Sequence, residues 1–127
     1  MQETLLTIQI NRPVSDVFAF TTDPQNTPLW VDSIVHEETN EWPVKHGTIY
    51  KNRNKTGEWS EYEVTSFELN KLFVFSLKGG SYHVRYTFTP LSDNSCELEY
   101  YEWVDDGELS DPFTMDIMAK LKQILEN

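Results

Sequence analysis

Tyrosine hydroxyls and one carboxyl group are the side chains of this sequence that could do chemistry inside a pocket. Tyr82 and Tyr86 are four residues apart and Tyr100 and Glu102 are two apart, so each pair lies on one face of an extended strand. A buried tyrosine hydroxyl needs a hydrogen-bond partner, which protein, water or ligand can supply. A carboxyl group in an apolar pocket can act as an acid or base. Glu102 is therefore the candidate catalytic residue; the alternative is a solvated carboxylate at the rim.

Other chemistries lack their usual motifs. His36, His46, His83 and Cys96 do not have the spacing of metal ligands, and the sequence has no glycine-rich phosphate loop or nucleophile elbow. We therefore expect no metal and no cofactor. Whether the chain is an enzyme stays open at this point.

Composition limits the partners and the compartment. The chain has 127 residues and a formal net charge of −11, which argues against binding nucleic acid or an anionic membrane surface. It has no apolar run long enough to insert stably in a bilayer and no secretory signal at its start. The single cysteine excludes an internal disulfide and fits a cytoplasmic location. This length predicts a single domain over residues 1–127.

The middle of the chain predicts antiparallel strands whose registers agree. The turn at Gly79-Gly80 pairs Phe73 with Tyr86 and Phe75 with Val84. The other turns place the same alternate residues of each strand on the inner face, so that one face of the sheet is apolar and the other is polar. The pairs they predict are Tyr50–Tyr62, Tyr62–Leu77, Val64–Phe75, Ser66–Phe73, Phe88–Cys96, Tyr86–Leu98, Val84–Tyr100 and Tyr82–Glu102 on the inner face, with Lys51–Glu61 and Arg85–Glu99 on the outer face.

The outer face carries the polar partners and two tryptophans. His83 and Arg85 fall there, which lowers their chance of taking part in catalysis in a pocket. Trp59 and Trp103 fall there as well, and exposed together they would form an apolar patch suited to a homodimer. The alternative is that a loop covers them. Cys96 points inward and is expected to be inert.

Helices are predicted at two places. Pro13 suits the start of a helix in which Val14, Val17 and Phe18 form an apolar stripe, and Asp23-Pro24 ends that helix. Pro28 can begin a second short helix that leads to Trp30. At the end of the chain, Asp111 and Pro112 suit a helix start, and an apolar stripe of Phe113, Ile117, Leu121 and Leu125 follows. Helices on one side of an antiparallel sheet give an α+β fold.

These stretches together resemble the START-like superfamily, also called SRPBCC, which includes polyketide cyclase/dehydrase-like proteins. The resemblance rests on "INRPVSDVFAFTTDPQNTPLW", "GTIY", "YEVTSFELNKLFVFSLKGGSYHVRYTFTPLSDNSCELEYYE" and the closing amphipathic helix. It implies a helix-grip fold, in which a curved antiparallel sheet wraps a C-terminal helix and two short helices lie between the first two strands. It also implies a hydrophobic cavity between sheet and helix. The closing helix here is short for the family, which implies a smaller or more open cavity.

The resemblance turns the inward aromatic face into a predicted ligand site. The ligand-contacting residues we expect are Trp30, Tyr50, Tyr62, Phe73, Phe75, Tyr82, Tyr86, Phe88, Tyr100, Met115 and Met118. The alternative for the tyrosines is that their rings form core while their hydroxyls reach the rim. The alternative for the methionines is plain core packing. Trp30 either closes one end of the cavity or plugs the core.

Three functions remain open on this evidence. The first is binding, transport or sequestration of a small hydrophobic molecule such as a lipid, polyketide or aromatic compound. The second is a cyclase/dehydratase-type enzyme that uses pocket tyrosines and Glu102 for proton transfer. The third is a protein-interaction module in which the cavity has collapsed.

Overall fold

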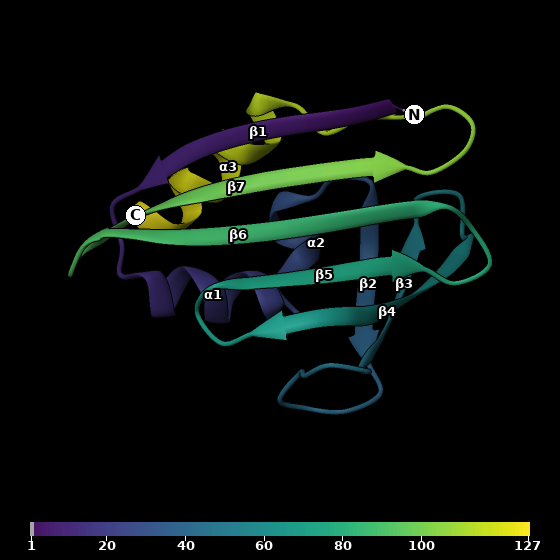
Figure 1. The fold of residues 1–127 in the computed structure, drawn as a ribbon, viewed down its shortest axis with the longest axis horizontal. Coiled ribbons are helices and arrows are strands. Elements are labelled where there is room, and N and C mark those ends of the chain that lie inside the picture. Colours follow the sequence, from purple (N-terminus) through teal and green to yellow (C-terminus); the bar gives the residue numbers. More distant parts are fainter. Residues whose placement is uncertain (1) are drawn as a thin grey trace.

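A computed structural model describes residues 2–127 and shows a seven-stranded antiparallel sheet with helices on its concave side (Figure 1). The elements follow one another as β1 (Gln2–Ile10), α1 (Val14–Thr22), α2 (Thr27–Trp30), β2 (Ile34–Thr39), β3 (Ile49–Asn54), β4 (Trp59–Glu68), β5 (Leu72–Leu77), β6 (Tyr82–Ser92), β7 (Ser95–Val104) and α3 (Met115–Glu126). This is the α+β fold that the sequence pattern predicts, in the helix-grip arrangement that the family resemblance implies. No helix within residues 2–127 is long and apolar enough to cross a bilayer.

The sheet runs in the order β1-β7-β6-β5-β4-β3-β2, so the first two strands of the chain form its two edges. It is strongly curved: in Figure 1, β2 and β3 turn behind the plane of β4 to β7, on the side where the helices lie. α3 lies behind β1 and β7, whereas α2 is next to β2. The concave side therefore has a half covered by α1 and α3 and a half enclosed by β2, β3 and β4.

The strand pairs predicted between β3 and β4 and between β5 and β6 are confirmed. Tyr50 pairs with Tyr62, Phe73 with Tyr86 and Phe75 with Val84, because short turns fix these registers. Tyr62–Leu77 and Val64–Phe75 are confirmed as well. Ser66 instead pairs with Val74, because a bulge follows Val64 and turns Phe67 inward.

The register predicted between β6 and β7 is wrong by two residues. Tyr86 pairs with Tyr100, Phe88 with Leu98 and Val84 with Glu102. The connection is tighter than the expected loop over residues 90–95, since Ser92 already pairs with Ser95. A shift of two residues leaves every side chain on its predicted face, so the inward aromatic set is unchanged.

The two short helices between β1 and β2 are confirmed. α1 ends at Thr22, directly before Asp23-Pro24, and Pro28 lies in the first turn of α2. Phe18 of α1 lies in the core, where its ring makes edge contacts with Phe73 and Phe88 at 5.8 and 5.1 Å between centroids. Burying such a side chain contributes roughly 1.5–3 kcal/mol, so these rings hold α1 on the sheet.

The start of the C-terminal helix differs from the prediction. α3 begins at Met115 with Thr114 as its cap, since the Thr114 hydroxyl accepts a hydrogen bond from the Ile117 amide. Asp111 has a positive φ of 50° and lies outside the helix. Phe113 precedes the helix, and its ring stacks on Tyr100 with 4.1 Å between centroids. Met118, Leu121 and Leu125 form the buried face of α3.

Candidate functional site

A cavity of about 510 Å³ lies on the concave side, in the half enclosed by β2, β3 and β4. Its floor consists of side chains from β3 to β7, and its other walls are α1, α2, β2 and the segment that joins β7 to α3. The rim carries exposed polar residues from that segment, among them Asp106, Glu108 and Ser110. This volume lies within the range of roughly 300–1,000 Å³ that is usual for small-molecule sites.

Aromatic rings form most of the floor. Tyr62 lies edge-on to Phe75 at 5.2 Å and to Tyr82 at 6.3 Å between centroids. Tyr50 stacks on Phe75 with 6.0 Å between centroids. Because neighbouring strands hold these rings against each other, their positions are fixed before any ligand arrives.

Glu37 is the partly buried carboxyl group on the inner wall of this cavity, and it was not predicted from the sequence. It lies on β2, lines the cavity and is partly buried. Its Oε1 accepts a hydrogen bond from the Thr27 hydroxyl at 2.6 Å, and its Oε2 accepts one from the Asn52 amide at 3.2 Å. Burial raises the pKa of Glu37 from 4.5 to about 7, and these two hydrogen bonds oppose that shift. Glu37 can therefore hold or release a proton near neutral pH.

The tyrosines of the cavity stay protonated. Burial raises the pKa of Tyr62 to about 12, and the charges of Glu37 and Glu102 add to this. Burial also raises the pKa of Tyr50, whose hydroxyl donates to the Thr22 carbonyl at 2.5 Å. These groups are neutral hydrogen-bonding groups at physiological pH, and they do not act as bases.

Glu102 lies on β7 and is 1% exposed. Its Oε1 accepts hydrogen bonds from the hydroxyls of Tyr82 at 2.6 Å and Tyr100 at 3.0 Å. Its Oε2 accepts one from the backbone amide of Phe113 at 2.8 Å. Glu102 is not among the residues that line the cavity. Its observed contacts tie the segment before α3 to the sheet, which is a structural role.

The structure divides the predicted ligand contacts into two sets. Those that line the cavity are Tyr50, Tyr62, Phe73, Phe75, Tyr82, Tyr86 and Tyr100. Those that lie away from it are Trp30, Phe88, Met115 and Met118. Phe88 lies in the core beneath α1, Met118 lies in the core on the buried face of α3, and Met115 is 45% exposed at the start of α3.

Trp30 lies in the core. It is 2% exposed, and its ring makes edge contacts with Tyr86 at 6.3 Å and Phe113 at 5.8 Å between centroids. Phe113 lies on the wall of the cavity, so Trp30 supports that wall from behind. No residue of α3 is among those lining the cavity. The prediction of a cavity between the sheet and the C-terminal helix is therefore wrong in this respect, because the cavity does not lie against α3.

The outer face of the sheet carries separate polar clusters. His83 bonds to the Ser76 hydroxyl through Nδ1 at 2.7 Å and to Asp105 through Nε2 at 2.6 Å, and its ring stacks on Trp103. Arg85 forms an ion pair with Glu99 at 3.0 Å, diagonally across β6 and β7. Trp59 is 48% exposed and packs beside His36. Trp59 and Trp103 thus belong to different clusters and do not form a joint patch.

A family of known proteins matches the chain along its length. The model of the family described as "Polyketide cyclase / dehydrase and lipid transport" matches residues 1–126. The chain belongs to this family. Among the described residues 2–127, no group of three histidine, cysteine or acidic side chains is placed to hold a metal ion. No curated protein sequence matches the chain significantly.

Solved structures share the fold of this polyketide cyclase/dehydrase family member. A START superfamily protein from Mycobacterium smegmatis is 13% identical, with a TM-score of 0.76 over 98% of this chain and 97% of that chain. The protein XoxI from Bacillus cereus is 15% identical, with a TM-score of 0.77 over 100% and 97%. The Aha1 dimer from Colwellia psychrerythraea is 14% identical, with a TM-score of 0.70 over 99% and 97%. Family and fold together indicate a START-like protein that binds a hydrophobic ligand.

Proposed function

We propose that this protein binds a small, largely aromatic or aliphatic molecule in the cavity between the concave sheet and the wall formed by α2, β2 and the β7–α3 segment. The observation that carries this proposal is the cavity itself, about 510 Å³ in volume and floored by aromatic rings. Lipids, polyketides and aromatic compounds all fall within this class, and the protein would transport or sequester them.

The make-up of the wall supports this function. Binding sites for small molecules combine an apolar lining with a few polar groups that orient the ligand. Here Phe73, Phe75 and Leu77 supply apolar surface, while Tyr62 and Glu37 add polar atoms at the wall. Side chains leave open space in the half of the concave side that β2, β3 and β4 enclose. In the half beneath α1 and α3, side chains fill the space between the helices and the sheet.

A dye titration with matched variants tests the proposal. N-Phenyl-1-naphthylamine, a neutral dye that fluoresces in apolar sites, should bind the purified protein. Ser60→Phe places a ring at the cavity wall, whereas Glu61→Phe places one on the opposite face of the same strand. Ser60→Phe should weaken dye binding about tenfold or more, corresponding to ~1.4 kcal/mol, and Glu61→Phe should leave it unchanged. Equal behaviour of the two variants, or no dye binding at all, would contradict the proposal.

A second candidate function is catalysis of dehydration or cyclisation. Glu37 favours it, because a carboxyl group with a pKa of about 7 can take a proton from carbon and return it to a leaving hydroxide as water. The test substrate is 4-hydroxy-4-phenylbutan-2-one, whose loss of water gives a conjugated ketone that absorbs strongly. Glu37→Gln should abolish turnover while dye binding persists. Turnover that survives this substitution would exclude the role of Glu37.

Partner classes follow from charge and from the relatives. We propose that nucleic acid is not a partner, since the formal net charge is −11. The Aha1 structure from Colwellia psychrerythraea is a dimer, and this favours testing for a homodimer of this chain. The exposed Trp59 is a candidate contact. Sedimentation of the wild type and of Trp59→Ser would show whether a dimer forms and whether it depends on this side chain.

A further inference from the structure

The charged side chains that line the cavity all carry the same sign. They are Glu37, Asp106, Glu108 and Asp111, and no lysine, arginine or histidine is among the described residues of the lining. A carboxylate or phosphate brought into this cavity would meet no positive counterion, and burying an unpaired charge is costly. The lining therefore discriminates between ligands by charge, independently of their apolar part.

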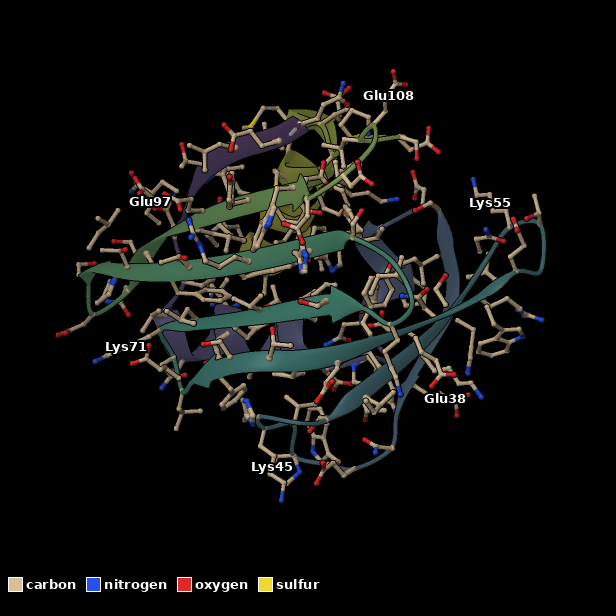
Figure 2. All side chains as sticks on the ribbon, turned by 45° about the vertical axis from the view of Figure 1, so that its right-hand side comes forward. Glu38, Lys45, Lys55, Lys71, Glu97 and Glu108 are labelled. Atoms are coloured by element: carbon tan, nitrogen blue, oxygen red, sulfur yellow. The ribbon has the colours of Figure 1, made fainter. Side chains whose placement is uncertain are left out.

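The acidic groups lie at two depths. Glu37 is on the inner wall, whereas Asp106, Glu108 and Asp111 belong to the segment between β7 and α3 at the mouth. Figure 2 shows Glu108 on this segment and Lys55 at the tip of the β3–β4 hairpin.

Two nearby lysines interact with a carboxylate that does not line the cavity. Lys120 forms an ion pair with Asp32 at 2.6 Å. The Lys120 ammonium holds the pKa of Asp32 below its usual value, and the charge of Lys55 adds to this effect. Lys120 is therefore paired with Asp32, which, like Lys120 and Lys55, is not among the residues lining the cavity.

The inner carboxyl group has unused hydrogen-bond capacity. Each oxygen of Glu37 accepts one hydrogen bond from the protein, from Thr27 or from Asn52. An ionised carboxylate offers about four acceptor positions, so about two remain for a ligand. The titratable groups on other elements whose pKa the charge of Glu37 raises are Tyr50, Tyr62 and Tyr86, and all three are neutral phenols.

The rings beside Glu37 suit a cation as well. Tyr50, Phe75 and Tyr62 form a continuous ring cluster on the cavity floor. The face of an aromatic ring is negative, and a cation within about 6 Å of the ring centre is attracted to it. A carboxylate together with aromatic faces matches an ammonium group that is attached to an apolar body.

We propose that the ligand of this cavity is a small organic cation, an amine with an aromatic or aliphatic body, whose ammonium group donates to Glu37 while its body lies against the aromatic floor. This inference rests on the proposed binding function and narrows its ligand class. It excludes fatty acids, acidic polyketides and anionic phospholipids as the preferred ligands.

Three probes that differ only in charge test the inference: 1-naphthylmethylamine, 1-naphthylmethanol and 1-naphthoate. Their affinities are measured by calorimetry at about pH 8, where Glu37 is ionised and the amine stays charged. The amine should bind about tenfold or more tightly than the alcohol, and the carboxylate should bind most weakly. The amine should also lose affinity at high salt, while the alcohol should not.

Matched variants locate the charge that is responsible. Glu37→Gln should reduce the affinity for the amine about tenfold and that for the alcohol far less, since the amide oxygen still accepts a hydrogen bond from a hydroxyl. Glu38→Gln removes the same charge from the exposed neighbour labelled in Figure 2 and should change neither affinity. If Glu37→Gln fails to fold, the salt dependence of the wild type still decides the question.

The outcomes separate this inference from the function on which it rests. If the alcohol or the carboxylate binds as tightly as the amine or more tightly, and Ser60→Phe still blocks this binding, the preference for a cationic ligand is overturned. The proposed binding function then remains intact. An amine whose affinity is unaffected by Glu37→Gln and by salt would also overturn the inference. Failure of all three probes and of the neutral dye to bind would overturn both.

Discussion

Glu102 and Glu37 both face the concave side of one sheet, and they differ in how their oxygens are used. Glu102 is almost fully buried and accepts three hydrogen bonds, from Tyr82, Tyr100 and the Phe113 amide. Glu37 accepts two and lies at the wall of a cavity. Burial alone therefore does not identify a functional carboxyl group; unused hydrogen-bond capacity next to a cavity is the better sign.

The same contrast holds for the rings around the two carboxyl groups. In the half next to α1 and α3, Trp30 packs against Phe113, and Glu102 accepts hydrogen bonds from Phe113 and Tyr100, whose rings lie at the border with the cavity. In the half enclosed by β2, β3 and β4, rings such as Tyr62 line open space. The packed half should therefore govern stability, and the hollow half should govern binding.

Trp30→Ala should have the largest effect. Truncating a fully buried tryptophan typically costs about 3–5 kcal/mol of unfolding free energy. Because Trp30 is not among the cavity-lining residues, the folded fraction should bind N-phenyl-1-naphthylamine with little change. Urea unfolding and dye titration measure the two quantities. A small loss of stability with a large loss of dye affinity would make Trp30 a lid, against the division into two halves.

Glu102→Leu should lower the free energy of unfolding of the protein by about 3 kcal/mol. It leaves the Tyr82 and Tyr100 hydroxyls and the Phe113 amide without their acceptor, and each unpaired buried group costs about 1–3 kcal/mol. Urea unfolding measures the effect, with Glu97→Leu, on the outer face of the same strand, as the control. Unchanged stability would show that these hydrogen bonds do not hold the segment before α3.

The pH dependence of stability should reveal Glu37. Its pKa is raised from 4.5 to about 7 by burial, so the folded state binds a proton more tightly than the unfolded chain. The stabilisation this gives is full below about pH 4.5 and is lost as the pH rises through 7. We expect a loss of about 2 kcal/mol, after allowing for the solvent that reaches this partly exposed group.

Glu37→Gln should remove this pH dependence, because an amide does not titrate. Unfolding free energies of the wild type and of the variant, compared between about pH 4.5 and 7.5, isolate the contribution of Glu37 from those of other groups. Glu38→Gln is the control for loss of a charge. Parallel pH profiles for Glu37→Gln and the wild type would place the pKa of Glu37 near its ordinary value.

Thr27→Val should have the smallest effect of the set. It removes the hydrogen bond to Glu37 Oε1 with little change in volume, which costs about 1 kcal/mol where Glu37 is ionised. It should also raise the pKa of Glu37 further, since this bond favours the charged form. Carbon-13 NMR of the glutamate carboxyl groups measures that pKa. If the pKa of Glu37 does not change, the hydrogen bond from Thr27 does not stabilise the charged form of this carboxyl group.

The features that sequence reasoning predicted are those that local rules determine. Gly79-Gly80 fixes the hairpin that pairs Phe73 with Tyr86, and Asp23-Pro24 ends α1 where expected. The side-chain period of two also kept Tyr100 and Glu102 on the inner face although their register was wrong by two residues.

Glu37 was missed because a bulge interrupts its strand. Counting in twos from Ile34 would place His36 inside and Glu37 outside. The pairing with β3 shifts between Ile34 and His36, so Ile34 and Glu37 both line the cavity. Phe113 was missed as a wall residue for a related reason: the helical spacing of the stripe continued past the true start of α3 at Met115.

The most direct test of the account is where a ligand perturbs the protein. The protein is labelled with carbon-13 in its tyrosine and phenylalanine rings and its methionine methyl groups, and is titrated with 1-naphthylmethanol. The account predicts shifts in Tyr62, Tyr82 and Phe75 that saturate with ligand, while Phe88 and Met118 stay nearly unchanged. Shifts centred on Phe88 and Met118, or no saturable shifts at all, would contradict it.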